Sequence, residues 1–109
     1  MRLKNKPFQV WIDMPDGSRF QVRDLPASKQ KEFIAKNQSN PVGMIMDCYG
    51  YQFTDWQGVK DEEGQDYPFS RDALKAAIEN DLDGLNEVMR EFSTKLAEHK
   101  ERLKSAEKN

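Results

Sequence analysis

Two short stretches near the start of the chain alternate between apolar and polar residues, which is the period of a strand with one buried face. The apolar positions of this pattern are Phe8, Val10, Ile12, Phe20 and Val22. The segment 14–18 between the two stretches contains the proline and the glycine that are typical of a tight turn. The pattern therefore predicts a β-hairpin over about residues 7–23, with Trp11 on its polar face and an apolar face that needs a covering helix.

Farther along the chain, apolar residues recur at the three- and four-residue spacing of helices. Residues 28–38 predict a short helix, because they are rich in helix formers, with Phe33 and Ile34 as its main apolar anchors. Asn40 followed by Pro41 is typical of a second helix start. Its apolar positions are Val42, Ile45, Met46, Tyr49 and Phe53. A strand over residues 44–49 is the alternative, because two glycines weaken this helix.

The last third of the chain again has helical periodicity, after a stretch from residue 54 to residue 67 that is punctuated rather than periodic and predicts a polar loop. Ser70 is a good N-cap for one helix, and Asp83 is interpreted as the cap of the last one. The apolar stripe of that last helix thins into charged residues. These patterns predict a helical part over about residues 27–96 and a solvated helical tail over about residues 97–109, which frays before its end.

The chain of 109 residues is long enough for one modest core and too short for two. We expect a single α+β domain over residues 1–109. In it, an N-terminal β-hairpin packs against a small bundle of about three to four helices, and a long charged helix ends the chain.

Composition and charge exclude several classes of function. The 17 basic and 19 acidic residues give a net charge of −2, so no global basic field is available to hold a nucleic acid. The sequence shows no membrane span and no secretory signal. Cys48 is the only cysteine and His99 the only histidine. Counting therefore excludes disulfide frameworks and Cys/His zinc sites, and it favours a reducing, cytosolic setting.

Candidate chemistry is sparse. His99 lies in the most charged stretch, where a solvated surface histidine is favoured over a general base. Cys48 on an apolar stripe is interpreted as an inert thiol. The acidic residues near position 62 lack the alternating oxygen ligands of a calcium loop, so a wet turn is favoured over a metal site. We expect no catalytic residue, no metal and no cofactor, and hence no enzyme.

Aromatic residues are numerous in and beside the predicted loop, and they have two interpretations. Trp56, Val59 and Phe69 are either loop anchors that fold back onto the helices, which is favoured, or a hot spot for a partner. Stacking on single-stranded nucleic acid is disfavoured, because the acidic residues around them would repel phosphate.

The same stretch carries a motif. It consists of a tryptophan-x-glycine-valine step, an acidic turn and a Pro-Phe-Ser helix start, with Leu74 a few residues on. Its residues are Trp56, Gly58, Val59, Asp61, Glu62, Gly64, Pro68, Phe69 and Ser70. In this motif the chain resembles the tail assembly chaperones of long-tailed bacteriophages and prophages. The last helix is longer and more charged than is usual in that family.

The resemblance implies a non-enzymatic factor that binds and shields the tape-measure protein before the tail tube polymerises. It implies contact with the major tail protein, action in the cytoplasm of the bacterial host and absence from the mature virion. Weak self-association is an expectation from the last helix instead: its stripe from Leu85 to Leu96 is mostly core, and the continuation to Leu103 is either a dimer seam or a ligand for a groove. The motif residues are then candidates for partner binding. The alternative is another phage-encoded interaction module, either a structural tail component or an inhibitor of a host protein. An enzyme is the third and weakest reading.

Overall fold

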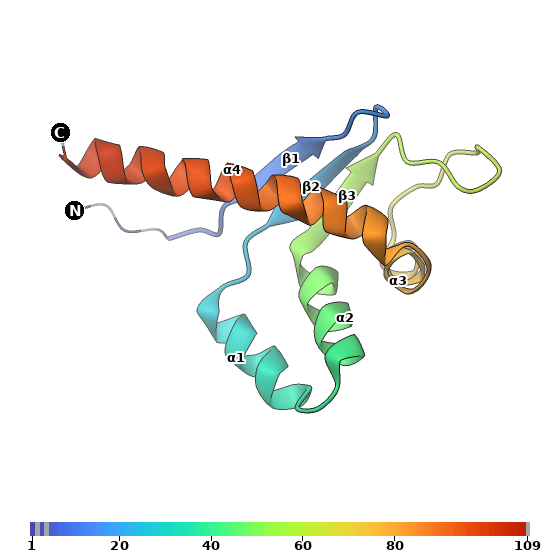
Figure 1. The fold of residues 1–109 in the computed structure, drawn as a ribbon, viewed down its shortest axis with the longest axis horizontal. Coiled ribbons are helices and arrows are strands. Elements are labelled where there is room, and N and C mark those ends of the chain that lie inside the picture. The colour runs from blue at the N-terminus through green and yellow to red at the C-terminus, as the bar shows by residue number, and fades with distance from the viewer. Residues whose placement is uncertain (2, 4, 109) are drawn as a thin grey trace.

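The computed structural model describes residues 1, 3 and 5–108, and within them the elements follow in the order β-β-α-α-β-α-α (Figure 1). The elements are β1 (Gln9–Asp13), β2 (Arg19–Arg23), α1 (Ala27–Lys36), α2 (Pro41–Gln52), β3 (Phe53–Gln57), α3 (Arg71–Asn80) and α4 (Leu82–Lys108). The predicted fold class is confirmed: the described residues form a hairpin and four helices, of which the last is long.

The predicted hairpin is present and belongs to a three-stranded antiparallel sheet in the order β1-β2-β3. In its register Val10 lies opposite Val22 and Ile12 opposite Phe20, so the expected apolar face forms. On that face α4 lies across the sheet, in contact with β1 and β2 (Figure 1). The apolar face of the sheet needs a covering helix, and α4, the last helix of the chain, covers it.

The third strand corrects the sequence-based description. The sequence pattern places Phe53 in the stripe of the second helix and residues 54–57 in the polar loop. Both predictions are wrong, because that helix ends at Gln52 and β3 runs from Phe53 to Gln57. The alternative strand over residues 44–49 is also wrong, because those residues are helical. A register shift opposite Gln21 and Val22 places both Phe53 and Trp56 on the apolar face. This bulge breaks the two-residue period by which a strand is recognised.

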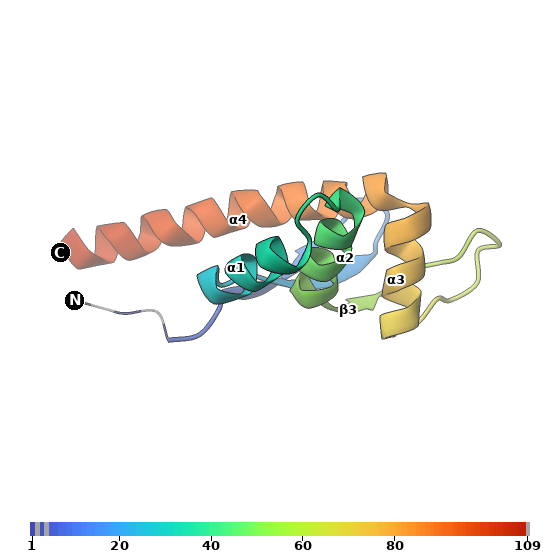
Figure 2. The same ribbon diagram turned by 90° about the horizontal axis from the view of Figure 1, so that it is seen from below.

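One hydrophobic core lies between the sheet and the helices. Strand residues fill one side of it, and α3 and α4 supply the other side. Its buried members are Ile12, Phe20, Val22, Phe53, Trp56, Ala73, Leu74, Ile78, Leu85, Val88 and Phe92. The helices α1 and α2 contribute none of these, since they form a hairpin that projects to one side of the sheet (Figures 1 and 2).

Two of the three predicted helix starts are confirmed. The side chain of Asn40 accepts a hydrogen bond from the N–H of Gly43, and that of Ser70 accepts one from the N–H of Ala73. The third is wrong by two residues, because Asp81, not Asp83, accepts the bond from the N–H of Gly84 at the start of α4. Either carboxylate suits a helix N-terminus, so the sequence alone does not separate them.

The C-terminal part of α4 runs on past the sheet to Lys108 (Figure 1). The prediction for His99 is corrected: its ring is partly buried and stacks on Phe8, with 4.4 Å between ring centroids. Phe8 therefore covers one side of α4 from Phe92 to His99. The end of the predicted tail, Asn109, lies outside the described residues. Among the described helices, none is long and apolar enough to cross a bilayer.

Candidate interaction surfaces

Trp56, the first residue of the motif, is a core residue. Its side chain is 4% exposed, and its indole Nε1 donates a 2.7 Å hydrogen bond to the carbonyl oxygen of Tyr67. Its ring lies edge-on to Phe69, with 5.1 Å between ring centroids, and is stacked with Tyr67 at 5.9 Å. Val59 and Phe69 also pack against the core. These contacts show the loop-anchor arrangement, in which Trp56 ties the C-terminal end of the 58–69 loop to the sheet.

Gly58 and Gly64 give this loop its shape. Both have positive φ, +69° at Gly58 and +80° at Gly64, a conformation that side chains disfavour. A Cβ at Gly58 would lie 3.1 Å from the carbonyl oxygen of Gly17, in the turn of the β1–β2 hairpin. Nothing lies within 4 Å of a Cβ at Gly64. The loop therefore rests against the hairpin at Gly58 and is free of it at Gly64.

This difference makes the two glycines a matched pair for substitution. Gly64→Ala is expected to cost about 1 kcal/mol of the free energy of unfolding, for the left-handed backbone alone. Gly58→Ala is expected to cost about 2 kcal/mol, because the new Cβ also pushes against Gly17. Urea unfolding of both variants measures this. An equal loss in the two would contradict the close approach.

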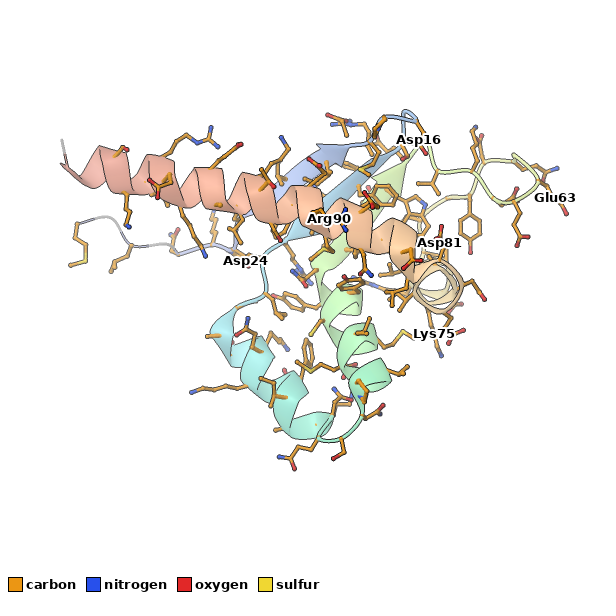
Figure 3. The ribbon with its side chains drawn as sticks, in the orientation of Figure 1. Asp16, Asp24, Glu63, Lys75, Asp81 and Arg90 are labelled. Atoms are coloured by element: carbon orange, nitrogen blue, oxygen red, sulfur yellow. The ribbon has the colours of Figure 1, made fainter. Side chains whose placement is uncertain are left out.

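The acidic turn, residues 60–66, is held by hydrogen bonds between its own residues. Asp61 accepts backbone bonds from the N–H groups of Glu63 (2.9 Å) and Gln65 (3.0 Å). Lys60 and Asp66 bridge across it, and the hydrogen bond from Lys60 lowers the pKa of the Asp66 carboxyl. Glu62 and Glu63 are exposed, and Glu63 points into solvent at the tip of the loop (Figure 3). No metal-binding group of three acidic, His or Cys side chains occurs among the described residues.

Pro68 and Ser70 complete the motif by starting α3. Pro68 is exposed, and the Ser70 hydroxyl caps the helix through a 2.9 Å bond from the N–H of Ala73. Arg71, the next residue, donates to the carbonyl oxygens of Gly50 (2.5 Å) and Phe53 (3.4 Å). Arg71, directly after the motif, thus joins α3 to the α2–β3 junction. The exposed members of the motif are Gly58, Glu62, Gly64, Pro68 and Ser70.

Hydrogen bonds to a side-chain carboxylate also close the β1–β2 turn. Asp16 accepts from the Ser18 hydroxyl (2.5 Å) and from the Ser18 N–H (2.9 Å), and these bonds lower the pKa of the Asp16 carboxyl. In the pH range between the folded and the unfolded pKa (the latter about 3.9), the unfolded chain binds more protons than the folded one. The stabilisation by Asp16 is therefore complete above the unfolded pKa and is lost as the pH falls through the folded pKa.

We accordingly expect the free energy of unfolding to fall more steeply below about pH 4 in the wild type than in Asp16→Asn. Urea unfolding at a series of pH values measures the two slopes. In a Ser18→Ala background, Asp16→Asn should change the slope less, because the hydroxyl donor is gone. Identical slopes in the wild type and in Asp16→Asn would contradict this role for the carboxylate.

The two side chains that the sequence offered for nucleophilic chemistry lie apart from the motif. Cys48, on α2, is partly buried, and burial raises the pKa of its thiol. His99 is stacked on Phe8, as described above. A shallow, open hollow beside this part of α4 is lined by Thr94, Ala97, Glu98, Glu101 and Arg102.

The α1–α2 hairpin, residues 27–52, exposes large apolar side chains, as does the N-terminus at Met1 and Leu3. No residue of α1 is buried, and Gln52 is the only buried residue of α2. Ile34 is 56% exposed and Val42 is 69% exposed. Val42 continues the α2 stripe of Ile45, Met46 and Tyr49, which packs on the core, to a point beyond that core. The sequence pattern identifies the α2 stripe but not the exposure of Val42, and its prediction of Ile34 as an apolar anchor of the first helix is wrong.

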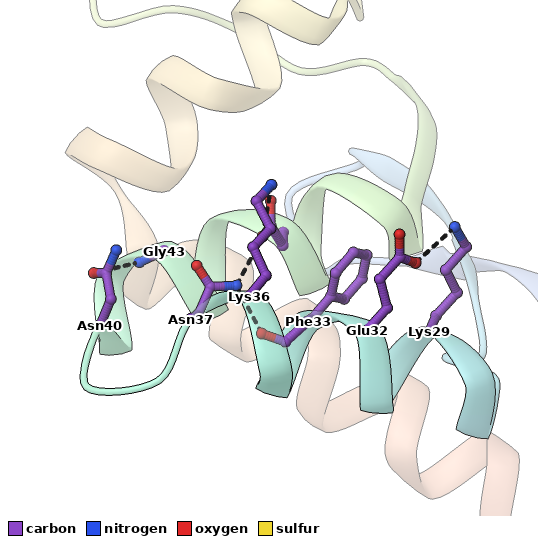
Figure 4. Close-up of polar contacts among 8 residues, drawn as sticks. Lys29, Glu32, Phe33, Lys36, Asn37, Asn40 and Gly43 are labelled. Carbon is purple, nitrogen blue, oxygen red and sulfur yellow. Dashed lines mark hydrogen bonds and ion pairs between the residues drawn. The ribbon is translucent and has the colours of Figure 1, made fainter.

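Polar contacts make the α1–α2 hairpin a fixed unit. At its tip, Asn37 Nδ2 donates to the carbonyl oxygen of Phe33 (2.9 Å) and to Asp47 (2.8 Å), and Lys36 pairs with Asp47 at 3.3 Å (Figure 4). Asn40 caps α2 beside them (Figure 4). The exposed apolar side chains are therefore presented on a hairpin that is hydrogen-bonded at its tip.

The base of the hairpin is equally well tied to the rest of the fold. Arg23 Nε donates to the carbonyl oxygen of Tyr51 (2.7 Å), and its guanidinium lies 3.8 Å from the centroid of the Tyr51 ring. The Tyr49 hydroxyl donates to Asn86 on α4 (2.5 Å). A surface that is fixed at both ends loses little conformational entropy on binding.

Comparison with known proteins adds no relative: no family model, no curated protein and no solved structure matches this chain.

Proposed function

We propose that this chain is a tail assembly chaperone of a long-tailed bacteriophage or prophage, which covers the apolar stripe of the tape-measure protein before the tail tube forms. The resemblance in residues 55–70 supports the family. In this chain the motif builds the loop between β3 and α3. A motif used in this way marks the fold, so the surface that binds the client is sought elsewhere.

The observation that carries the binding role is the α1–α2 hairpin, with Ile34 and Val42 exposed on two helices that hold one buried residue between them. A long amphipathic client helix needs its stripe covered, because exposed apolar helices aggregate. Apolar side chains on a fixed hairpin can supply that cover without any covalent step. Release by tail tube subunits requires modest affinity per copy, with avidity from several copies along one client.

The test is co-expression with the tape-measure protein from the same phage or prophage genome, recognised as a very long, helix-rich reading frame. We expect the client to be soluble and to co-purify with this chain, and to be insoluble when expressed alone. A client that aggregates equally with and without folded chaperone would refute the proposal. Finding the protein in purified virions would instead favour a structural tail component.

A further inference from the structure

One edge of the sheet is formed by β1, and its outer backbone groups are available to pair with another strand. β1 stands at the end of the strand order and pairs only with β2 (Figure 1). The N–H of Asp24 donates to the carbonyl oxygen of Phe8 (2.8 Å). The N–H of Met14 donates to the carbonyl oxygen of Ser18 (2.9 Å). In an antiparallel pair these groups alternate, so every second residue of β1 directs its N–H and C=O away from β2. Those residues are Gln9, Trp11 and Asp13.

This edge has few of the devices by which edge strands are protected, namely the charge of Asp13 and a proline on either side of the strand. β1 contains no proline, glycine or lysine, and its register with β2 is regular over all five residues. The opposite edge strand, β3, carries the register shift and is followed at once by the 58–69 loop. Pro7 and Pro15 bracket β1 and limit the open edge to the strand itself.

We infer that β1 is the interface of a homodimer, in which it pairs antiparallel with β1 of a second copy about a two-fold axis at Trp11. This register joins two three-stranded sheets into one of six strands. It places Gln9 opposite Asp13 of the second copy, Val10 opposite Ile12 and Trp11 opposite its own equivalent. All the outward-facing backbone groups of Gln9, Trp11 and Asp13 then find partners.

The side chains of β1 suit this self-pairing on both faces. On the polar face an amide lies beside a carboxylate, and the central pair is aromatic, so no like charges meet. On the apolar face Val10 meets Ile12, which continues the row of apolar pairs already present between β1 and β2. α4 lies over β1 and β2, so the two copies of α4 would lie on the same face of the joined sheet.

Trp11 is a second observation that supports the homodimer. It is a large apolar side chain on an otherwise polar face, partly exposed, with the guanidinium of Arg19 4.8 Å from its ring centroid. Arg19 in turn pairs with Asp13 at 2.6 Å. In the dimer the two Trp11 rings become neighbours across the axis, and each gains the cover that its own chain does not supply.

The interface is short, so we expect a Kd of about 10 µM. Sedimentation equilibrium from about 1 to 300 µM, a range that brackets this Kd, should show the mass rising from 12.7 kDa toward twice that value. Gln9→Pro removes an outward N–H that makes no bond within the sheet, and Gln9→Ala is its matched control. We expect Gln9→Pro to raise the Kd at least about tenfold and Gln9→Ala to leave it within about twofold.

A wild-type protein that stays monomeric over the whole range overturns the inference. So does a dimer that Gln9→Pro, with the thermal midpoint of Gln9→Ala, fails to weaken, because the contact would then use another surface.

A disulfide tests the register even if the proline variant fails to fold. Gln9→Cys combined with Asp13→Cys in a Cys48→Ser background keeps Trp11 and places each new thiol opposite one of the second copy, with Cα atoms about 5.5 Å apart. We expect oxidation to give a covalent dimer from this variant. Gln21→Cys in the same background, on the neighbouring strand, should stay monomeric. Equal cross-linking of the two variants overturns the proposed register.

Discussion

Trp56→Ala is expected to lower the free energy of unfolding by about 3–5 kcal/mol, the range for a large aromatic side chain removed from a core. Trp56 is 4% exposed and is in contact with Phe20 from the sheet and Phe69 from the loop. Its loss also leaves the carbonyl oxygen of Tyr67 without its indole donor. Since small domains are stable by about 5–15 kcal/mol in total, this variant should be at or near the limit of folding. Urea unfolding followed by circular dichroism measures the loss.

Trp56→Phe separates the two causes of that loss. Phenylalanine keeps most of the aromatic contact with Phe20 and Phe69 but cannot donate to Tyr67, so we expect a loss of about 1–2 kcal/mol. A loss below about 1 kcal/mol for Trp56→Ala would mean that the motif tryptophan is not the anchor of the loop, and it would reopen its role as a partner hot spot.

The sequence was sufficient wherever local chemistry decides the structure. The hairpin register follows from two alternating runs and a turn that needs glycine, and Gly17 indeed has φ +93°. Asn40 and Ser70 were predictable as caps, because a short polar side chain before a helical run has one favoured use. These features depend on neighbours within a few positions, which a single sequence contains.

β3 could not be predicted in the same way, since its identity depends on distant partners. Its sequence Phe-Thr-Asp-Trp-Gln does not alternate cleanly, because the bulge opposite β2 places Phe53 and Trp56 on one face, three positions apart. Phe53 also fits the spacing of the preceding helix stripe. Only the pairing with β2, some thirty residues earlier, resolves the choice, and propensity is overridden by such contacts.

For the candidate site, the residue types were predictable but the exposure was not. The aromatic anchor interpretation of Trp56 rested on composition and is now supported by distances. His99 looked solvated because its sequence neighbours are charged, yet Phe8 reaches it from the other end of the chain. Conversely, Val42 looked like part of a buried stripe, and it is exposed because the core ends before the helix does.

That exposure leads to the most direct test of the proposed client surface. Ile34→Glu combined with Val42→Asp puts two charges where an apolar client stripe would pack, and we expect the client Kd to rise about 100-fold, or ~2.7 kcal/mol. Stability should change by less than about 1 kcal/mol, because both side chains are exposed and an acid near the start of α2 favours the helix. Titration calorimetry with a tape-measure fragment measures the binding. Gln65→Glu with Ser93→Glu adds the same charge at exposed sites outside the hairpin and should bind normally. Equal binding by both double variants would place the client surface elsewhere on the fold.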